Sequence, residues 1–125
     1  NTIKTATVTV SSAEILSCNA APKQLLPALS AGNLYEIISI IGINNYGTAK
    51  YEAGTDKLEI RYETGDTMFE FPNAFIEATA DCVYRGLVTT EAILIEKKVE
   101  MYCASAPTTG NGTFTFVITY REHAV

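Results

Sequence analysis

The sequence predicts a mainly β protein: an antiparallel β-sandwich with one or two short helices, for which a jelly roll is the candidate topology. Three observations support this fold class. About seven or eight short segments have strand-like patterns, turn residues separate them at the spacings of a sandwich, and strands do not alternate with helices along the chain. The 125 residues suit a single domain, 1–125.

The N-terminal part predicts a strand followed by one helical turn. Ile3–Val10 alternates threonines with small apolar residues, so one face of the strand is polar and the other apolar. Ser11 and Glu14 then have the spacing of a capping box, which begins a short helix. This helix would turn Ile15 and Leu16 inward.

The middle of the chain predicts an edge strand, a hairpin and a second helix. Prolines flank Lys23–Leu26, which is typical of an edge strand. Lys57–Glu63 alternates apolar with charged residues, and Thr67–Phe71 follows a short turn as its hairpin partner. A weak helical stripe begins after Pro72 and includes Cys82, which predicts a short helix.

Two further apolar regions close the chain. Ala92–Cys103 contains two apolar runs separated by Glu96–Lys98, which is interpreted as either a hairpin turn or a bulge. Thr113–Glu122 alternates aromatic or aliphatic residues with threonines and predicts a final strand, in which Val117 is the apolar exception on the outer row.

The segment Leu34–Tyr46 differs from the other predicted strands because it has apolar residues on both faces. Regular alternation places Ile38 and Ile40 on one face. The other face then carries three isoleucines: Ile37, Ile41 and Ile43. One set fills the core, and the second set must be covered either by a short helix or by a neighbouring subunit. The sequence therefore identifies Ile37, Ile41 and Ile43 as a candidate subunit interface.

Charge and hydropathy argue against two classes of partner. Nine basic residues stand against fourteen acidic ones, giving a net charge of −5, and no basic cluster exceeds Lys97–Lys98. Nucleic-acid binding needs a basic patch, so it is not expected. No apolar run reaches the length of a membrane span, and the first residues do not resemble a signal peptide, so no membrane association is expected.

The three cysteines, Cys18, Cys82 and Cys103, have neither the spacing of a zinc site nor the even number of a disulfide framework. We interpret them as small buried residues of a protein from a reducing compartment. A single disulfide among them is the alternative.

No catalytic, cofactor or metal site is predicted, and the protein is expected not to be an enzyme. The only histidine, His123, lies near the C-terminus, where residues often fray. Acidic residues such as Glu59 and Glu63 fall on the polar face of a strand. Asn111–Thr113 fits a glycosylation sequon, but a turn is the preferred interpretation. A glycosidase with a carboxylate pair is the enzymatic alternative.

Tyrosines suggest one candidate contact for a ligand or partner. The chain has seven tyrosines and no tryptophan. Tyr46 and Tyr51 lie in a long polar connection beside Asn44 and Asn45, and these four residues form the candidate contact. Packing in the core or in loops is the other interpretation.

An ordered set of segments carries a resemblance to a known family. The segments are TATVTVSSAEILSCNAAPKQLLPA, LEIRY, FIEATADCVYR and PTTGNGTFTFVITYRE. Together they resemble small accessory virion proteins of tailed bacteriophages, of the head-fibre or decoration type. The cysteines and the segment LSAGNLYE depart from the family's pattern.

The resemblance implies a structural virion protein without catalytic residues, assembled in the cytoplasm of the bacterial host. It implies a homo-oligomer, with a trimer favoured, that attaches to other virion proteins such as the major capsid protein. A receptor- or glycan-binding module of a phage fibre is the alternative function.

Overall fold

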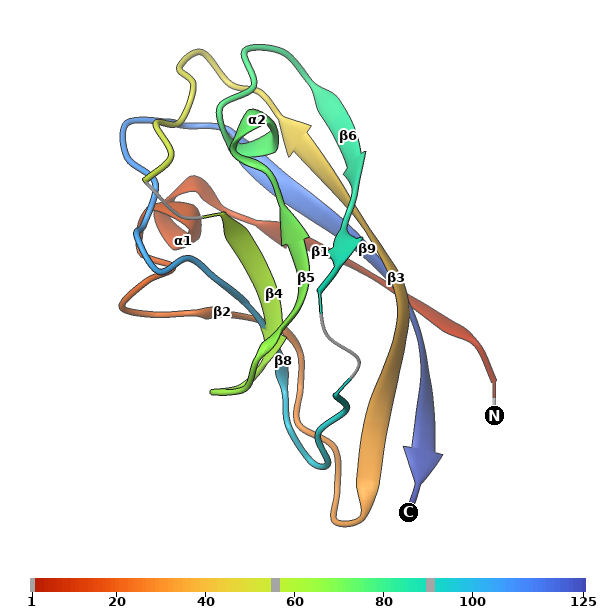
Figure 1. Cartoon of the computed structure of the whole chain (residues 1–125). Coiled ribbons are helices and arrows are strands. Elements are labelled where there is room, and N and C mark those ends of the chain that lie inside the picture. The colour runs from red at the N-terminus through yellow and green to blue at the C-terminus, as the bar shows by residue number, and fades with distance from the viewer. Residues whose placement is uncertain (1, 55–56, 90–91) are drawn as a thin grey trace.

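Two antiparallel sheets pack face to face in the computed structural model, which describes residues 2–54, 57–89 and 92–125 (Figure 1). The four-stranded sheet has, in spatial order, β1 (Lys4–Val10), β9 (Thr113–Ala124), β3 (Asn33–Asn45) and β6 (Cys82–Arg85). The five-stranded sheet has β2 (Lys23–Leu26), β8 (Val99–Tyr102), β4 (Leu58–Tyr62), β5 (Thr67–Phe71) and β7 (Leu87–Val88). The two helices are α1 (Ser12–Leu16) and α2 (Asn73–Ile76). The predicted β-sandwich with short helices is confirmed.

The order of the strands is that of a jelly roll. The outermost strands of the chain pair with each other, β1 with β9 and β2 with β8, and the inner ones pair as β3 with β6 and β4 with β5. Successive strands at the start of the chain alternate between the two sheets. Nested pairing of this kind folds one long antiparallel ladder into two layers.

The first strand and helix form as the sequence predicts, with one exception. Ser11 accepts a hydrogen bond from the Glu14 backbone nitrogen (3.2 Å), and Glu14 Oε1 accepts one from the Ser11 backbone nitrogen (2.9 Å). Both bonds of the capping box are therefore present. Ile15 is fully buried, but Leu16 is exposed, because a single helical turn can direct only one of two neighbouring residues at the core.

An aromatic cluster fills the core at the end of the sandwich where α2 lies (Figure 1). The ring of Phe75 lies 5.0 Å from the rings of Phe71 and Phe114, between centroids, and 6.4 Å from that of Phe116. Gly42 of β3 makes room for these rings, because a Cβ atom there would lie 2.7 Å from Phe71 Cε2. A glycine in the middle of the longest strand is thus required by close packing.

The second helix is shorter than its predicted stripe. Pro72 is its N-cap, and the helix ends at Ile76. Cys82 was expected to belong to the stripe but begins β6, in which it pairs with Asn44. Cys82 belongs to a strand because burial alternates from this residue onward: Val83 is exposed, and Tyr84 faces inward against Phe75 (5.7 Å between ring centroids).

The region Ala92–Cys103 contains neither the hairpin nor the bulge that the sequence suggested. Only its second apolar run forms a strand, β8. In the first run, Ile95 forms an isolated bridge with Leu34, and the backbone nitrogen of Glu96 donates to the carbonyl of Asn33 (2.8 Å). This segment therefore connects the five-stranded sheet to β3 instead of pairing with β8.

Candidate interaction surface

The outer face of the five-stranded sheet is charged and internally paired. Arg61 Nε lies 2.8 Å from Glu100 Oε2, and the Arg61 guanidinium lies 3.8 Å from the centroid of the Tyr102 ring. A second ion pair joins Lys57, just before β4, to Glu70 of β5, with 2.9 Å between Nζ and Oε1. Lys57 is exposed to water, whereas Glu100 is buried beneath its neighbours and is compensated by its pair with Arg61.

The outer face of the four-stranded sheet has a different composition. The cross-strand register places mostly uncharged side chains in rows across the strands, and the exposed Arg85 of β6, opposite Ile41, is the charged side chain of these rows. The residues of this surface, which we call the Thr/Ile face, are Thr5, Thr7, Thr9, Ile41, Ile43, Val83, Arg85, Thr115, Val117 and Thr119. Exposed β-branched apolar side chains gathered on one face are typical of a surface that contacts another protein.

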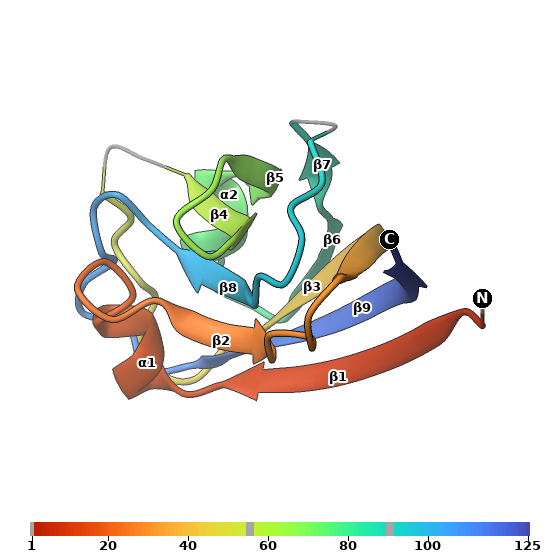
Figure 2. The ribbon, with the colours of Figure 1, turned by 90° about the horizontal axis from the view of Figure 1, so that it is seen from below.

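No helix covers the Thr/Ile face within the ranges that the structure describes. Both helices lie at one end of the sandwich, on the side of the five-stranded sheet (Figures 1 and 2). Ile41 remains 38% exposed and Val83 65% exposed. The alternative in which a helix of the same subunit covers the second face of Leu34–Tyr46 is therefore wrong.

A β-bulge in β3 changes which isoleucines share a face. The pairing of β3 with β9 shifts between Ile37 and Ser39, so Ile38 is an extra residue. As a result Ile37 packs against the core, together with the fully buried Ile40, whereas Ile38 is exposed. The prediction that Ile37 belongs to the outer face is wrong. The proposed interface role of Ile41 and Ile43, which do face outward, stays a prediction.

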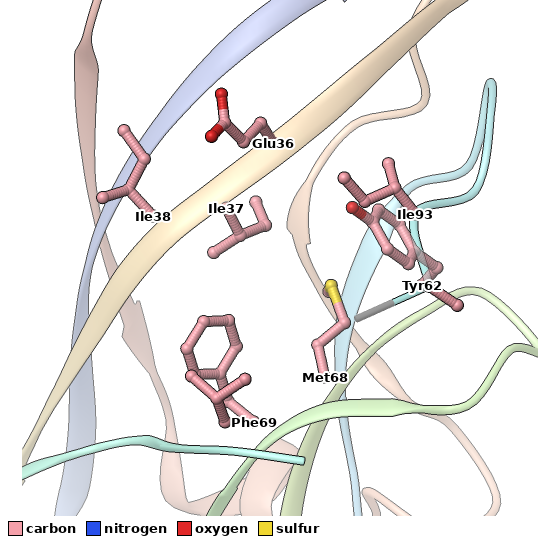
Figure 3. A pocket seen from close by; sticks show the side chains of 9 residues that line it. Glu36, Ile37, Ile38, Tyr62, Met68, Phe69 and Ile93 are labelled. Atoms are coloured by element: carbon pink, nitrogen blue, oxygen red, sulfur yellow. The ribbon is translucent and has the colours of Figure 1, made fainter. Parts of the chain in front are cut away.

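A hollow of about 240 Å³ lies between β3 and β5, next to the bulge (Figure 3). Its lining is mostly apolar: Glu36, Ile37, Ile38, Tyr62, Met68, Phe69, Val88, Ala92 and Ile93. In Figure 3, Ile37 points toward Met68 and Phe69, and Ile38 lies on the other side of the strand. Val88 and Ile93, which line the hollow, are also exposed.

Glu36, at the rim of this hollow, is held by the last strand. His123 Nε2 lies 2.8 Å from Glu36 Oε1, and this hydrogen bond is the main cause of the lowered pKa of Glu36. The expectation that His123 belongs to a frayed tail is wrong, because His123 is part of β9 and pairs with Leu34 of β3.

Two of the four residues predicted to contact a ligand are buried, so their predicted role is wrong. Asn44 is 2% exposed, and its Nδ2 donates to the carbonyl of Phe75 (2.8 Å) at the end of α2. Tyr51 is also 2% exposed, and its hydroxyl donates to the carbonyl of Gly112 (2.6 Å). Both residues hold parts of the fold together.

The other two predicted contacts, Asn45 and Tyr46, are half-buried. Asn45 Nδ2 donates to Thr113 Oγ1 (3.1 Å) and Thr115 Oγ1 (3.0 Å), at the end of the Thr/Ile face. The backbone nitrogen of Tyr46 donates to Asp81 Oδ1 (2.8 Å). Their role in contacting a partner stays a prediction.

Replacing Asn44 by alanine is expected to lower the free energy of unfolding by about 1–3 kcal/mol, because the carbonyl of Phe75 loses its buried donor. Urea unfolding would measure the loss. Gln24→Ala, which removes an amide side chain at an exposed position of β2, is the control. A loss for Asn44→Ala that is no larger than about 0.5 kcal/mol would contradict the role assigned to this residue.

Three further features concern the chemistry of the site. Across residues 2–54, 57–89 and 92–125, no group of three or more His, Cys, Asp or Glu side chains could hold a metal ion. No helix in those ranges is long and apolar enough to cross a membrane. No disulfide joins the three cysteines, all of which are described, and Cys18 and Cys103 are fully buried.

Comparison with known proteins identifies a similar fold. A scan against models of protein families and a search of curated proteins found no match. Among solved structures, the chain is similar to a chain of the cyanophage Pam1 capsid asymmetric unit, with a TM-score of 0.58 and 11% sequence identity. The alignment covers 95% of this chain and 82% of that chain. At this identity the similarity shows a shared fold, extending over nearly the whole sandwich.

Proposed function

We propose that this chain is a non-enzymatic structural protein of a bacteriophage virion, which associates with copies of itself and with other virion proteins. The observation that carries the proposal is the similarity in fold, over nearly the full length, to a chain of a phage capsid. The matched chain is only slightly longer than this one, so a single sandwich of this size serves as one component of that capsid.

The difference between the two outer faces supports an attached component. The outer face of the five-stranded sheet carries charged side chains such as the exposed Lys57 and its partner Glu70, whereas the Thr/Ile face carries rows of threonine and aliphatic side chains with Arg85 at one edge. A protein fixed to a particle needs one face of each kind. We therefore assign the Thr/Ile face, with Ile38 and Val88 at its margin, to contacts with neighbouring virion proteins.

Within the virion, the sequence resemblance favours a decoration or head-fibre role, with attachment to the major capsid protein. Assembly would take place in the cytoplasm of the host, and the resemblance favours a trimer.

Capsid binding tests this proposal. The double variant Ile41→Lys/Val83→Lys introduces two charges on the Thr/Ile face at exposed positions. We expect the variant to stay folded but to bind at least about tenfold more weakly to capsids that lack the protein, because buried unpaired charges are strongly unfavourable. Co-sedimentation with such capsids measures the binding, and circular dichroism checks the fold.

Gln24→Lys/Ala104→Lys is the charge-matched control, since it adds two charges at exposed positions away from the Thr/Ile face. The control should bind like the wild type. Equal binding by the double variant and the control would refute the assignment of the face. Absence of capsid binding by the wild-type protein would refute the proposed function itself.

A further inference from the structure

The two sheets have four edge strands, and three of them are protected against pairing with another chain. β2 is short, lies between Pro22 and Pro27, and contains a shift in register between Gln24 and Leu26. β7 has two residues and β6 has four. Short, irregular or proline-flanked edges are features by which proteins avoid adding a further strand.

β1 is the exception among these edges. All seven of its residues pair with β9 in one continuous register without a bulge, from Lys4 with Tyr120 to Val10 with Phe114. No proline interrupts it, and its only charged residue is at one end. It therefore presents a long regular row of backbone groups along its outer edge, which is the template for an added strand.

The side chains of β1 define what an added strand must look like. Thr5, Thr7 and Thr9 lie on the Thr/Ile face and are exposed. Ala6 and Val8 face the core but are only partly buried, so the edge of the core is not fully covered. An added strand needs polar, β-branched residues on one face and small apolar residues on the other.

The sequence of β1 itself meets this requirement. In an antiparallel pair, residues directly opposite each other share a face. With Thr7 placed opposite Thr7 of a second copy, Thr5 lies opposite Thr9, and Ala6 lies opposite Val8. The same register places each Lys4 opposite Val10 of the other copy, so the two lysines lie at opposite ends of the pair.

We propose that two copies of this chain associate through antiparallel pairing of their β1 edges, which joins the two four-stranded sheets into one continuous sheet. The inference deepens the self-association included in the proposed function. Such a contact is isologous and closes on itself as a dimer, in place of the trimer that the resemblance favours. It also makes the two Thr/Ile faces continuous, so that the pair presents one larger surface for attachment.

Charge pairs at opposing positions test the register. In Thr5→Lys/Thr9→Lys, each introduced lysine lies opposite another lysine, and dimerisation should weaken by roughly tenfold. In Thr5→Lys/Thr9→Glu, each lysine lies opposite a glutamate, and dimerisation should return at least to the wild-type value. Thr79→Lys/Ala104→Lys is the charge-matched control at exposed positions outside β1, and it should dimerise like the wild type.

Sedimentation velocity at micromolar concentrations measures each association constant. A wild-type monomer, a wild-type trimer, or a dimer equally affected by both β1 variants would overturn the inference. Pairing of β1 only with a strand from a different virion protein would also overturn it, and would appear as monomers in solution whose capsid binding is lost in both β1 variants. Capsid binding by a monomeric wild type would leave the attachment role of the Thr/Ile face standing without the dimer.

Discussion

Replacing Phe75 by alanine is expected to lower the free energy of unfolding by about 3–5 kcal/mol. The side chain is fully buried and contacts rings from three strands, which include Phe71, Phe114 and Tyr84. Its removal leaves a cavity between the two sheets and leaves Ile76 as the remaining buried side chain of α2. A loss of this size is a large part of the total stability of a small domain, so the variant should be close to unfolding at 37 °C.

Urea unfolding at neutral pH measures this loss. Phe75→Leu keeps most of the volume and should lose substantially less stability, since swaps that preserve volume usually cost less than about 1.5 kcal/mol. Leu87→Ala removes an exposed apolar side chain of β7 and should change stability by no more than about 0.5 kcal/mol. A loss below about 1 kcal/mol for Phe75→Ala would contradict the packing described for the core.

The protein is expected to lose most of its stability between pH 10 and pH 12. Burial raises the pKa of Tyr35, Tyr51 and Tyr62 from 10.0 to about 12. Their hydroxyls donate hydrogen bonds to the carbonyls of Pro27, Gly112 and Tyr35, in that order, and each bond is 2.6 Å long. The neutral hydroxyl is therefore favoured in the folded state by both burial and hydrogen bonding.

The direction of the effect follows from proton binding. Above pH 10 the tyrosines of the unfolded chain lose their protons while those of the folded chain keep them, so the free energy of unfolding falls as pH rises. Each tyrosine accounts for about 2 kcal/mol between pH 10 and pH 12, and the three together for about 6 kcal/mol. This sum is comparable to the whole stability of a typical domain.

Urea unfolding at several pH values from 7 to 12 measures this dependence. Tyr62→Phe should remove about one third of it, because the phenylalanine variant has no proton to lose at that site. Stability that stays constant between pH 10 and pH 12 would contradict the burial of the three hydroxyls.

Alternating patterns in the sequence were sufficient to predict most of the fold. Leu58, Ile60 and Tyr62 are buried as their spacing indicates, and β5 is the hairpin partner of β4. The capping box was equally informative, because its two bonds depend only on residues three positions apart. Features that depend on contacts between distant segments were not predicted. β7 has only two residues, and its pairing with β5 leaves no periodic signal in its own sequence.

The candidate surface was predicted only in part, for a related reason. Regular alternation through Leu34–Tyr46 fails at the bulge, which is created by the pairing of β3 with β9 and cannot be seen in β3 alone. The exchange of Ile37 for Ile38 on the outer face follows from that single extra residue. The outward position of Val83 could have been predicted, because in a strand it points away from its neighbours Cys82 and Tyr84, which face inward. The prediction of a helix over this segment hid that alternation.

Cryo-electron microscopy of phage particles purified from the source of this sequence tests the proposed virion role most directly. We expect density for the jelly roll at repeated positions on the particle, with Ile41 and Val83 buried against neighbouring protein. The charged face that contains Lys57 and Glu70 should point toward solvent. Virions without such density would contradict the virion role. A sandwich attached through its charged face, with the Thr/Ile face in solvent, would contradict the assignment of the interaction surface.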